Sequence, residues 1–425
     1  MNISEIYKRF LESTGVCTDT RKIEFGNVFF ALNGPSFNGN EFAANAIEAG
    51  CIYAIIDEAE YVQGDKYILV DNVLETLQAL ANTHRKQMGA TIFGITGSNG
   101  KTTTKELMYS VFSKKFNTLA TEGNLNNHIG VPLTLLKLRE EHEVAIIEMG
   151  ANHVGEIRVL CEIAEPELGL ITNIGKAHIG EFGGFENIIQ AKMELFDYLI
   201  KNKGVLFVNA DDPVLMNKTE SIDRILYGKN ESAKVNGEVI NDQDLLELRV
   251  FYPDMDMIKT QLFGNYNFSN IMAAIATGHY LKIDPSDIKN GIEEFVPSNN
   301  RSQVLKTERN TVILDAYNAN PSSMMAALEN FKAAKGESKF VILGDMLELG
   351  NDSASEHDSI IVWTRENDME GVFVGDHFAA SELVETPYSN VEELISSKVL
   401  EDMKGRTILI KGSRGIKLEK LKGVL

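Results

Sequence analysis

Short runs of apolar residues, separated by longer mixed segments, dominate the middle of the chain. These runs are apolar almost throughout, as strands buried on both faces of a sheet must be. After the first run, Leu107, Met108, Val111 and Phe112 fall on one face at a 3.6-residue period, which predicts a helix. Because strand and helix patterns alternate, we expect a parallel, doubly wound sheet. Its predicted strands are residues 91–95, 144–147, 169–172 and 205–208.

Smaller α/β units are expected on both sides of this sheet. In the N-terminal unit, strands at residues 28–32 and 51–56 bracket a helix at 41–49, and a helix at 73–86 leads into the central sheet. From about residue 298 a new series of strands begins, and each ends in a polar or glycine-containing segment; they are residues 312–314, 340–343, 372–374 and 407–410. A chain of 425 residues is too long for one ordinary core. The expected domains are residues 1–88, 89–297 and 298–425.

The pattern changes between about residues 225 and 262. Short alternating segments such as LELRVFY and MIKTQLF predict a small antiparallel extension of the central sheet. Asn236-Gly237 has the composition of a two-residue hairpin turn, and we expect it to join two of these strands. A helix at residues 268–280 is expected to close the central domain.

Composition narrows the class of protein. The 41 Lys and Arg residues against 61 Asp and Glu residues give a formal net charge of −20, which argues against nucleic acid or an anionic membrane as the main partner. The 3 cysteines are scattered and lack a C-x-x-C spacing, which fits a reduced compartment and no disulfide framework. The first residues lack the apolar core of a signal peptide, and no uncharged apolar run approaches membrane-spanning length. We expect a soluble, cytoplasmic protein.

The segment TIFGITGSNGKTTTKELMYSVF carries the clearest chemistry. It predicts a buried strand, a glycine-rich turn and a helix that begins near Lys101. Backbone N–H groups of such a turn, together with the helix N-terminus, form an anion site for phosphates. Lys101 would reach the terminal phosphate, and the Thr102 hydroxyl would ligate Mg²⁺. Ile95 stands where the longer phosphate-loop pattern has Gly, so the shorter G-x-x-G-K-T form is satisfied. The expected ATP or GTP contacts are Gly97, Ser98, Asn99, Gly100, Lys101, Thr102 and Thr103.

Further candidates follow the other central strands, where ligands of such sheets gather. Glu148 could supply the carboxylate that a nucleotide–Mg²⁺ site needs. His178 lies in a glycine-rich loop, and its spacing favours a functional and a structural role equally. Lys192 lies on a predicted helix, where its pattern alone indicates a solvated surface lysine. Arg21, on a loop before the first predicted strand, could hold an anion, although its pattern favours a solvated surface arginine.

Two asparagine-rich segments remain ambiguous from their pattern. The amides of TEGNLNNHIGVP suit phosphate or peptide oxygens, and they equally suit the capping of turns. GNYNFSN, at the predicted start of the helix at 268–280, offers the same two interpretations. The residues concerned are Asn124, Asn126, Asn127, Asn265, Asn267 and Asn270.

Taken together, these segments resemble the ATP-dependent Mur ligases over essentially the whole chain. Motifs of that family occur here in its order: TGSNGKTTT, NLNNHIGVP, IIEMGANHVGEI, NIGKAHIGEFG, AKMELF, NADDP, GNYNFSNIMAA and DAYNANPSSM. Three stretches, DAYNANP, LGDMLELG and KGSRG, resemble the branch that adds D-alanyl-D-alanine. Two departures are visible: Tyr266 stands where the family often has His, and Asn300 precedes Arg301 where Gly is commoner. Both affect the expected adenine and ribose contacts.

The resemblance implies roles for individual residues. The family's seven signature positions, expected to be catalytic, fall on Lys101, Glu148, His178, Asn267, Asn270, Arg301 and Asp315, of which Asn267, Arg301 and Asp315 would also contact the nucleotide. Lys192 matches the lysine that the family carbamylates with CO₂. Two Mg²⁺ ions are implied, one at Thr102 and Glu148 and the other at His178 and Lys192. The implied substrate contacts are Thr20, Arg21, Asn124, Asn126, Asn127, Tyr317, Asn318 and Asn320.

The resemblance also implies the architecture and the reaction. A small N-terminal domain would hold the uridine diphosphate of UDP-N-acetylmuramoyl-tripeptide, the central domain would bind ATP, and a Rossmann-like C-terminal domain would close over it. D-Alanyl-D-alanine would be joined to the tripeptide through an acyl phosphate by a protein expected to be a monomer. Other interpretations remain: a folylpolyglutamate-type ligase or another Mur-type ligase, or a phosphate-loop switch that controls a partner. A degenerate, non-catalytic binding module fits least, because all seven signature positions are filled.

Overall fold

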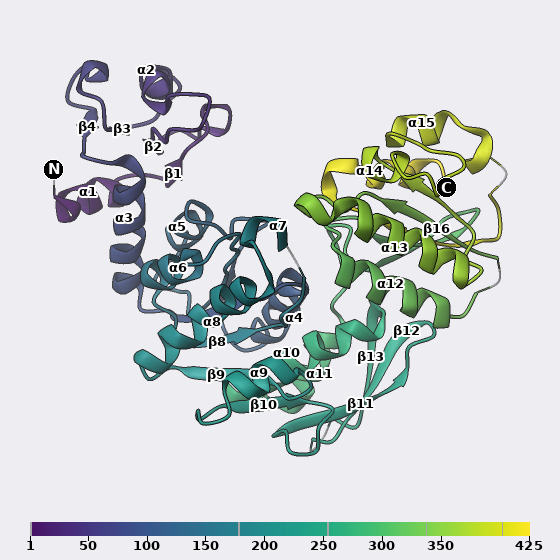
Figure 1. Ribbon diagram of the computed structural model, residues 1–425. Coiled ribbons are helices and arrows are strands. Elements are labelled where there is room, and N and C mark those ends of the chain that lie inside the picture. The colour runs from purple at the N-terminus through teal and green to yellow at the C-terminus, as the bar shows by residue number, and fades with distance from the viewer. Residues whose placement is uncertain (1, 177–178, 253–254, 337, 402) are drawn as a thin grey trace.

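The computed structural model describes residues 2–176, 179–252, 255–336, 338–401 and 403–425, whose strands form three sheets (Figure 1). The first sheet is parallel throughout, in the order β1-β2-β3-β4. Its strands are β1 (Val16–Cys17), β2 (Val28–Phe30), β3 (Tyr53–Ile56) and β4 (Tyr67–Leu69), accompanied by α1 (Ile3–Leu11) and α2 (Ala43–Glu48). The long helix α3 (Val73–Met88) leads from this sheet into the central domain, as the sequence predicts.

The central sheet confirms the predicted doubly wound arrangement. Its order is β13-β12-β11-β10-β9-β8-β5-β7-β6, and the strands from β6 to β11 are parallel. The four predicted strands are present as β5 (Thr91–Thr96), β7 (Val144–Glu148), β8 (Leu168–Ile171) and β9 (Val205–Asn209). The remaining strands are β6 (Thr118–Ala120), β10 (Ile225–Gly228), β11 (Val235–Asn241), β12 (Leu245–Val250) and β13 (Met257–Phe263).

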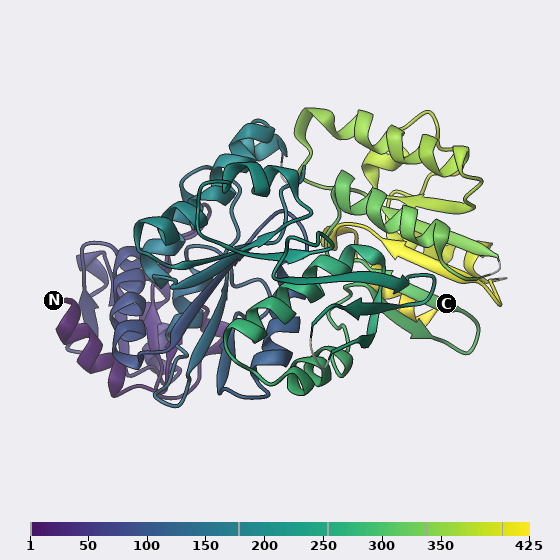
Figure 2. The same cartoon turned by 90° about the horizontal axis from the view of Figure 1, so that it is seen from below.

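Helices cover both faces of the central sheet (Figure 2). Successive side chains of each strand point to opposite faces, so both faces are apolar and each packs in its own core. Phe93 and Ile95 of β5 join one core, which is covered by α4 (Lys101–Phe112), α10 (Phe268–Tyr280) and α11 (Pro285–Glu293). Ile92 joins the other core. The helices on that side and at its end are α5 (Gly130–Leu135), α6 (Glu156–Ala164), α7 (Ile179–Phe182), α8 (Phe185–Lys201) and α9 (Pro213–Lys218).

The predicted turn at Asn236-Gly237 is wrong. Both residues lie inside β11, which pairs antiparallel with β12, and the chain reverses only after Asn241. A Cβ atom at Gly237 would lie 2.5 Å from the carbonyl oxygen of Arg249 on β12. The glycine therefore permits a close approach of two strands rather than a turn.

The C-terminal sheet has the order β14-β15-β18-β16-β17, with β14 as an antiparallel edge strand. Its strands are β14 (Gln303–Lys306), β15 (Thr311–Asp315), β16 (Lys339–Gly344), β17 (Gly371–Val374) and β18 (Thr407–Lys411). The four strands predicted here are all present, whereas β14 was not predicted. The accompanying helices are α12 (Pro321–Ala333), α13 (Ser353–Glu366), α14 (Asp376–Ala379) and α15 (Val391–Ser396).

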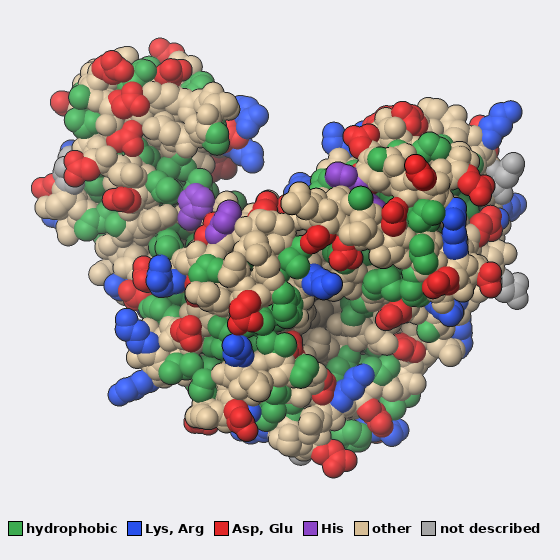
Figure 3. Space-filling model, viewed as in Figure 1, with side chains coloured by type: hydrophobic (Ala, Val, Ile, Leu, Met, Phe, Trp, Pro, Cys, Tyr) green, Lys and Arg blue, Asp and Glu red, His purple; other side chains and the backbone are tan. Residues whose placement is uncertain are grey.

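The two flanking domains stand apart on one side of the central domain, and the surface between them is deeply notched (Figure 3). The three-domain α/β architecture agrees with the expectation from sequence. Cys17, Cys51 and Cys161 are buried and free. Across the described ranges, none of the helices combines the length and the apolar character needed to cross a membrane.

Candidate active site

The turn between β5 and α4 has the backbone that a phosphate loop requires. Gly97 has φ +140° and Gly100 has φ +79°, a region that side-chain-bearing residues rarely adopt. A Cβ atom at Gly97 would lie 2.0 Å from Thr172 Oγ1, and one at Gly100 would lie 2.6 Å from Asn270 Oδ1. Both glycines are therefore required for close packing as well as for backbone shape. The N-cap residue of α4 is Gly100, which has no side chain to cap the helix, so the N–H groups of the first turn can serve an anion.

Lys101 begins α4 and points back over the loop. Its Nζ donates to the carbonyl oxygens of Gly97 at 2.5 Å and Ser98 at 3.2 Å. Burial lowers the pKa of Lys101, and the nearby charge of Glu148 opposes that shift. The carbonyl oxygens of the loop thus hold the ammonium at the cavity wall, and its contact with a phosphate stays a prediction.

Thr102 and Glu148 meet at the ends of α4 and β7. Thr102 Oγ1 donates to Glu148 Oε2 at 2.9 Å, and Asn126 Nδ2 donates to Glu148 Oε1 at 2.9 Å. Glu148 is 2% exposed. A carboxylate beside a hydroxyl is the kind of oxygen pair that Mg²⁺ prefers, so these residues fit the ion that accompanies a nucleotide.

Lys192 is not the solvated surface lysine that its pattern indicates. It lies on α8 with 2% exposure, and its Nζ donates to the carbonyl oxygen of Ala151 at 3.3 Å. Burial, reinforced by the charge of Lys101, lowers the pKa of Lys192 to about 7. His178, its expected partner at the second Mg²⁺, lies outside the described residues. The described part of the chain holds no group of three or more His, Cys, Asp or Glu side chains that could bind a metal.

The asparagines at the start of α10 are used mainly within the protein. Asn270 Nδ2 donates to Asn267 Oδ1 at 2.9 Å, and Asn270 Oδ1 accepts from Thr104 Oγ1 at 3.0 Å. Asn267 Nδ2 donates to the carbonyl oxygen of Phe263 at 2.8 Å. These bonds join α10 to α4 directly behind the phosphate loop.

The segment around Asn124 divides its amides between several tasks. Asn127 Oδ1 accepts from the N–H groups of Ile129 and Gly130 at 3.1 and 2.9 Å, and so supports the start of α5. Asn126 holds Glu148, as described above, whereas Asn124 is exposed. One amide of this loop therefore supports a helix start and another holds Glu148, whereas contacts of these amides with substrate stay a prediction.

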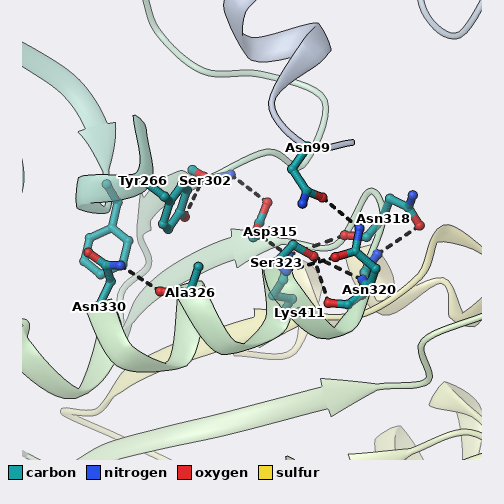
Figure 4. Close-up of polar contacts among 12 residues, drawn as sticks. Asn99, Tyr266, Ser302, Asp315, Asn318, Asn320, Ser323, Ala326, Asn330 and Lys411 are labelled. Carbon is teal, nitrogen blue, oxygen red and sulfur yellow. Dashed lines mark hydrogen bonds and ion pairs between the residues drawn. The ribbon is translucent and has the colours of Figure 1, made fainter. Parts of the chain in front are cut away.

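Residues of the C-terminal domain form a polar cluster with Tyr266 of the central domain (Figure 4). Asp315, at the end of β15, accepts from Lys411 Nζ at 2.6 Å and from the N–H of Ser302 at 3.2 Å. Tyr266 and Ser302 are joined through their hydroxyl oxygens at 2.8 Å, and burial raises the pKa of Tyr266. Lys411 is 2% exposed, so its charge is paired with Asp315 away from solvent.

Arg301 and Tyr317 stack beside this cluster. The guanidinium carbon of Arg301 lies 3.8 Å from the centroid of the Tyr317 ring. Arg301 Nε is buried and has no hydrogen-bond partner within the described structure. A buried donor without a partner is costly, so it indicates a position where a ligand would bind.

One hydrogen bond joins the phosphate loop directly to the C-terminal domain. Asn320 Nδ2 donates to Asn99 Oδ1 at 2.7 Å, and Figure 4 shows the two side chains pointing toward each other. Asn320 also caps α12, since its Oδ1 accepts from the N–H of Ser323 at 2.9 Å. Asn99 is held from the other side, because its carbonyl oxygen accepts from Thr172 Oγ1 at 2.6 Å. The C-terminal domain thus touches the nucleotide site itself.

These groups surround a cavity of about 1210 Å³. Most residues predicted for the site line this cavity. The described exceptions are Gly97, Lys192, Thr20 and Arg21, and His178 lies outside the described residues. Arg21 is 86% exposed and forms an ion pair of 2.8 Å with Asp19, whose pKa it lowers to about 2. The predicted roles of Thr20 and Arg21 in binding the uridine diphosphate therefore stay predictions. Among the residues that the structure describes, Leu74 and Gln78 of α3 form the N-terminal part of the cavity wall.

Sequence reasoning missed three basic residues of the cavity wall, Arg158, Lys411 and Arg414. Lys411 and Arg414 belong to the KGSRG stretch, whose resemblance to the family implied no role for its individual residues. Arg158 lies in the first turn of α6, where a cation is unfavourable because of the helix dipole. That mismatch was the available signal for Arg158.

The chain matches models of the Mur ligase family along most of its length. The matched models are described as Mur ligase family, catalytic domain (residues 12–101), Mur ligase middle domain (95–278) and Mur ligase, glutamate ligase domain (300–414). A Bacillus subtilis relative named UDP-N-acetylmuramoyl-tripeptide--D-alanyl-D-alanine ligase is 35% identical over 99% of this chain and 96% of its own length.

Solved structures of the same kind agree with the fold. MurF from Acinetobacter baumannii superimposes with a TM-score of 0.88 at 30% identity, covering 99% of this chain and 98% of that one. MurF ligase from Thermotoga maritima, in complex with ADP, gives a TM-score of 0.85 at 25% identity, with 98% and 97% coverage. The chain belongs to the Mur ligase family.

Proposed function

We propose that this protein is the ligase that joins D-alanyl-D-alanine to UDP-N-acetylmuramoyl-tripeptide, using ATP, in cytoplasmic peptidoglycan precursor synthesis. The observation that carries the proposal is the shared cavity, in which the phosphate loop, the Thr102–Glu148 pair and the C-terminal residues around Asp315 face one space. The name of the Bacillus subtilis relative supports the choice of substrates over a folate substrate. A switch protein would need no third α/β domain reaching the nucleotide, whereas here Asn320 touches Asn99.

The nucleotide would be held between two domains. The N–H groups at the start of α4 and the ammonium of Lys101 would hold the β- and γ-phosphates. Arg301, with its unpartnered buried Nε, and Asp315 would contact the nucleotide from the C-terminal side. The pair Tyr266–Ser302 would shape that wall, where the family often has a histidine in place of Tyr266.

The tripeptide carboxylate and the triphosphate are both anionic, so their approach needs positive charge. Lys101 supplies part of that charge from the protein. Two bound Mg²⁺ ions would supply the rest. Thr102 and Glu148 would hold the first ion, and His178 with carbamylated Lys192 the second. A pKa of about 7 leaves much of Lys192 as the neutral amine at physiological pH, which is the form that reacts with CO₂.

The carboxylate would attack the γ-phosphorus to give an acyl phosphate and ADP. The dipeptide amine would then attack the acyl carbonyl, and phosphate would leave. The protein's contribution is to align the reactants, which is worth up to roughly 7–11 kcal/mol, and to exclude water while the acyl phosphate exists. The domains proposed for these tasks are residues 1–88, 89–297 and 298–425, in a protein that acts as a monomer.

A substrate panel tests the assignment. The purified protein would be given ATP and Mg²⁺ with UDP-N-acetylmuramoyl-tripeptide and D-alanyl-D-alanine, or with a folate and glutamate. ADP formation that requires both the tripeptide and the dipeptide is the expected result. ADP formation with folate and glutamate would assign the protein to the rival ligase class. ADP formation that needs no acceptor would favour the switch.

A further inference from the structure

The part of the cavity wall that belongs to the C-terminal domain includes three basic residues among its polar side chains, and their charges are in different situations. Lys411 is neutralised by Asp315 at 2.6 Å, and Arg301 is stacked on Tyr317. Arg414 has an exposed side chain, and no carboxylate within the described ranges forms an ion pair with it. It therefore offers a positive charge to whatever enters the cavity.

The backbone that carries Arg414 is firmly held, although its side chain is not. The N–H of Ser413 donates to the carbonyl oxygen of Asp345 at 3.0 Å, and Ser413 Oγ accepts from the N–H of Leu347 at 3.0 Å. A Cβ atom at Gly412 would lie 2.8 Å from Gly344 Cα, so β18 ends in direct contact with the end of β16. The position of the Arg414 Cα is thus set by two neighbouring strand ends.

Tyr317 gives the Arg414 side chain a surface on which to lie. The guanidinium carbon of Arg414 is 5.5 Å from the centroid of the Tyr317 ring, and Arg301 lies 3.8 Å from the same centroid. Stacking on an aromatic ring leaves the edge of a guanidinium free to donate two parallel hydrogen bonds. Carboxylates and phosphates are the ligands whose geometry matches that edge.

The acceptor named under the proposed function has such a group. D-Alanyl-D-alanine must present its amine to the acyl phosphate near Lys101, and its carboxylate remains charged at the opposite end. The hydrogen bond between Asn320 and Asn99 places the segment that carries Tyr317 against the phosphate loop, which is where this acceptor has to bind. Under the proposed function, Lys101 and the start of α4 would hold the triphosphate, which leaves Arg414 for the carboxylate of the acceptor.

We propose that Arg414, lying on Tyr317, binds the terminal carboxylate of the acceptor dipeptide and makes the enzyme select acceptors that end in a free carboxylate. This inference rests on the proposed ligase function and adds a specificity-determining residue to it.

The test compares two acceptors in two proteins. D-Alanyl-D-alanine and D-alanyl-D-alaninamide share a skeleton and a nucleophilic amine, but only the first has a carboxylate. Hydrogen bonds to a charged group correspond to a factor of about 10 to 100 in kcat/KM, so the wild type should prefer the acid by about that factor. In Arg414→Gln, kcat/KM for the acid should fall to the level of the amide, while kcat/KM for the amide and the KM for ATP stay unchanged.

Two further variants serve as controls. Arg414→Lys keeps the charge and loses the two-pronged geometry, so it should restore part of the preference for the acid. Arg139→Gln removes a surface arginine whose side chain is 75% exposed, outside the cavity wall, and should leave the preference unchanged. Thermal melting of each variant shows whether the fold is retained, and Arg414→Lys carries the test if Arg414→Gln does not fold.

Retention of the preference for the acid in Arg414→Gln would overturn the inference and leave the ligase function standing. Equal losses with acid and amide, or a change confined to the KM for ATP, would also overturn it, because Arg414 would then act elsewhere in the reaction. If the wild type ligates neither acceptor, the proposed function fails and the inference falls with it.

Discussion

Replacement of Gly97 by alanine is the perturbation for which the structure allows the closest estimate. The residue has φ +140°, and a Cβ atom there would lie 2.0 Å from Thr172 Oγ1 and 3.0 Å from the Thr172 nitrogen. The same hydroxyl donates to the carbonyl oxygen of Asn99 at 2.6 Å. A methyl group at position 97 must therefore displace the group that holds the phosphate loop in place.

Three contributions determine the expected loss. The unfavourable backbone region costs about 1–2 kcal/mol, the overlap with Thr172 about 1–3 kcal/mol, and the lost hydrogen bond about 0.5–1.5 kcal/mol. The loop relieves this strain by moving, so the loss appears in nucleotide binding rather than in folding. A combined cost of roughly 3–6 kcal/mol corresponds to a decrease in ATP affinity of about 10²- to 10⁴-fold.

Calorimetric titration with ATP and Mg²⁺ measures that affinity, and Gly64→Ala provides a matched control. Gly64 has φ +143°, but no heavy atom lies within 4 Å of the position that an alanine methyl group would take there. The control therefore has the backbone penalty without the overlap and lies outside the site, so its ATP affinity should equal that of the wild type. Wild-type ATP affinity in Gly97→Ala would refute the reasoning, because the nucleotide would then not depend on this loop.

Three other variants probe the site and the fold. Lys101→Ala should reduce kcat for ligation by at least about 10²–10³-fold with an unchanged melting temperature, and undiminished ADP formation would contradict its role. Lys192→Ala should lose about 10–100-fold in activity. Added acetate should restore part of it, because its carboxylate can replace the carbamate group of the lysine. Failure of any small carboxylate to restore activity would count against carbamylation. Burial lowers the pKa of His84, which contacts Tyr7 and the carbonyl oxygen of Leu138. The unfolded chain therefore binds this proton more readily than the folded protein once the pH falls below about 6.5, so the melting temperature should decrease on acidification. His84→Gln should show a smaller decrease, and an equal decrease would mean that another group is responsible.

Much of the central domain could be predicted because its elements have strong patterns. The helix expected at residues 268–280 is α10, Phe268–Tyr280, and the four apolar runs are strands in a parallel sheet. Long periodic segments and fully apolar runs carry this information locally. The strands that escaped prediction, such as β1 and β14, are short and half-buried, so their residues show no comparable pattern.

The candidate site was predictable where a motif combines strand, turn and helix, as around Lys101. It was less predictable where a role depends on distant partners. Lys192 resembles a surface lysine until the packing of α8 is known, and only the family resemblance indicated otherwise. Lys411 finds Asp315 at a separation of 96 residues, which no local pattern records. Asn236-Gly237 misled because glycine serves close strand contact as well as turns.

The central claim is that the terminal carboxylate of the tripeptide is activated by ATP in this cavity and that its acyl group is transferred to the amine of D-alanyl-D-alanine. The most direct measurement uses UDP-N-acetylmuramoyl-tripeptide labelled with ¹⁸O in its terminal carboxylate, with mass analysis of both products. The account predicts a pentapeptide product that forms only when the dipeptide is present, and one ¹⁸O atom in each released phosphate, because the attacking carboxylate oxygen leaves with the phosphorus. Pentapeptide without labelled phosphate would contradict the acyl-phosphate route, and phosphate release without pentapeptide would contradict the assigned function.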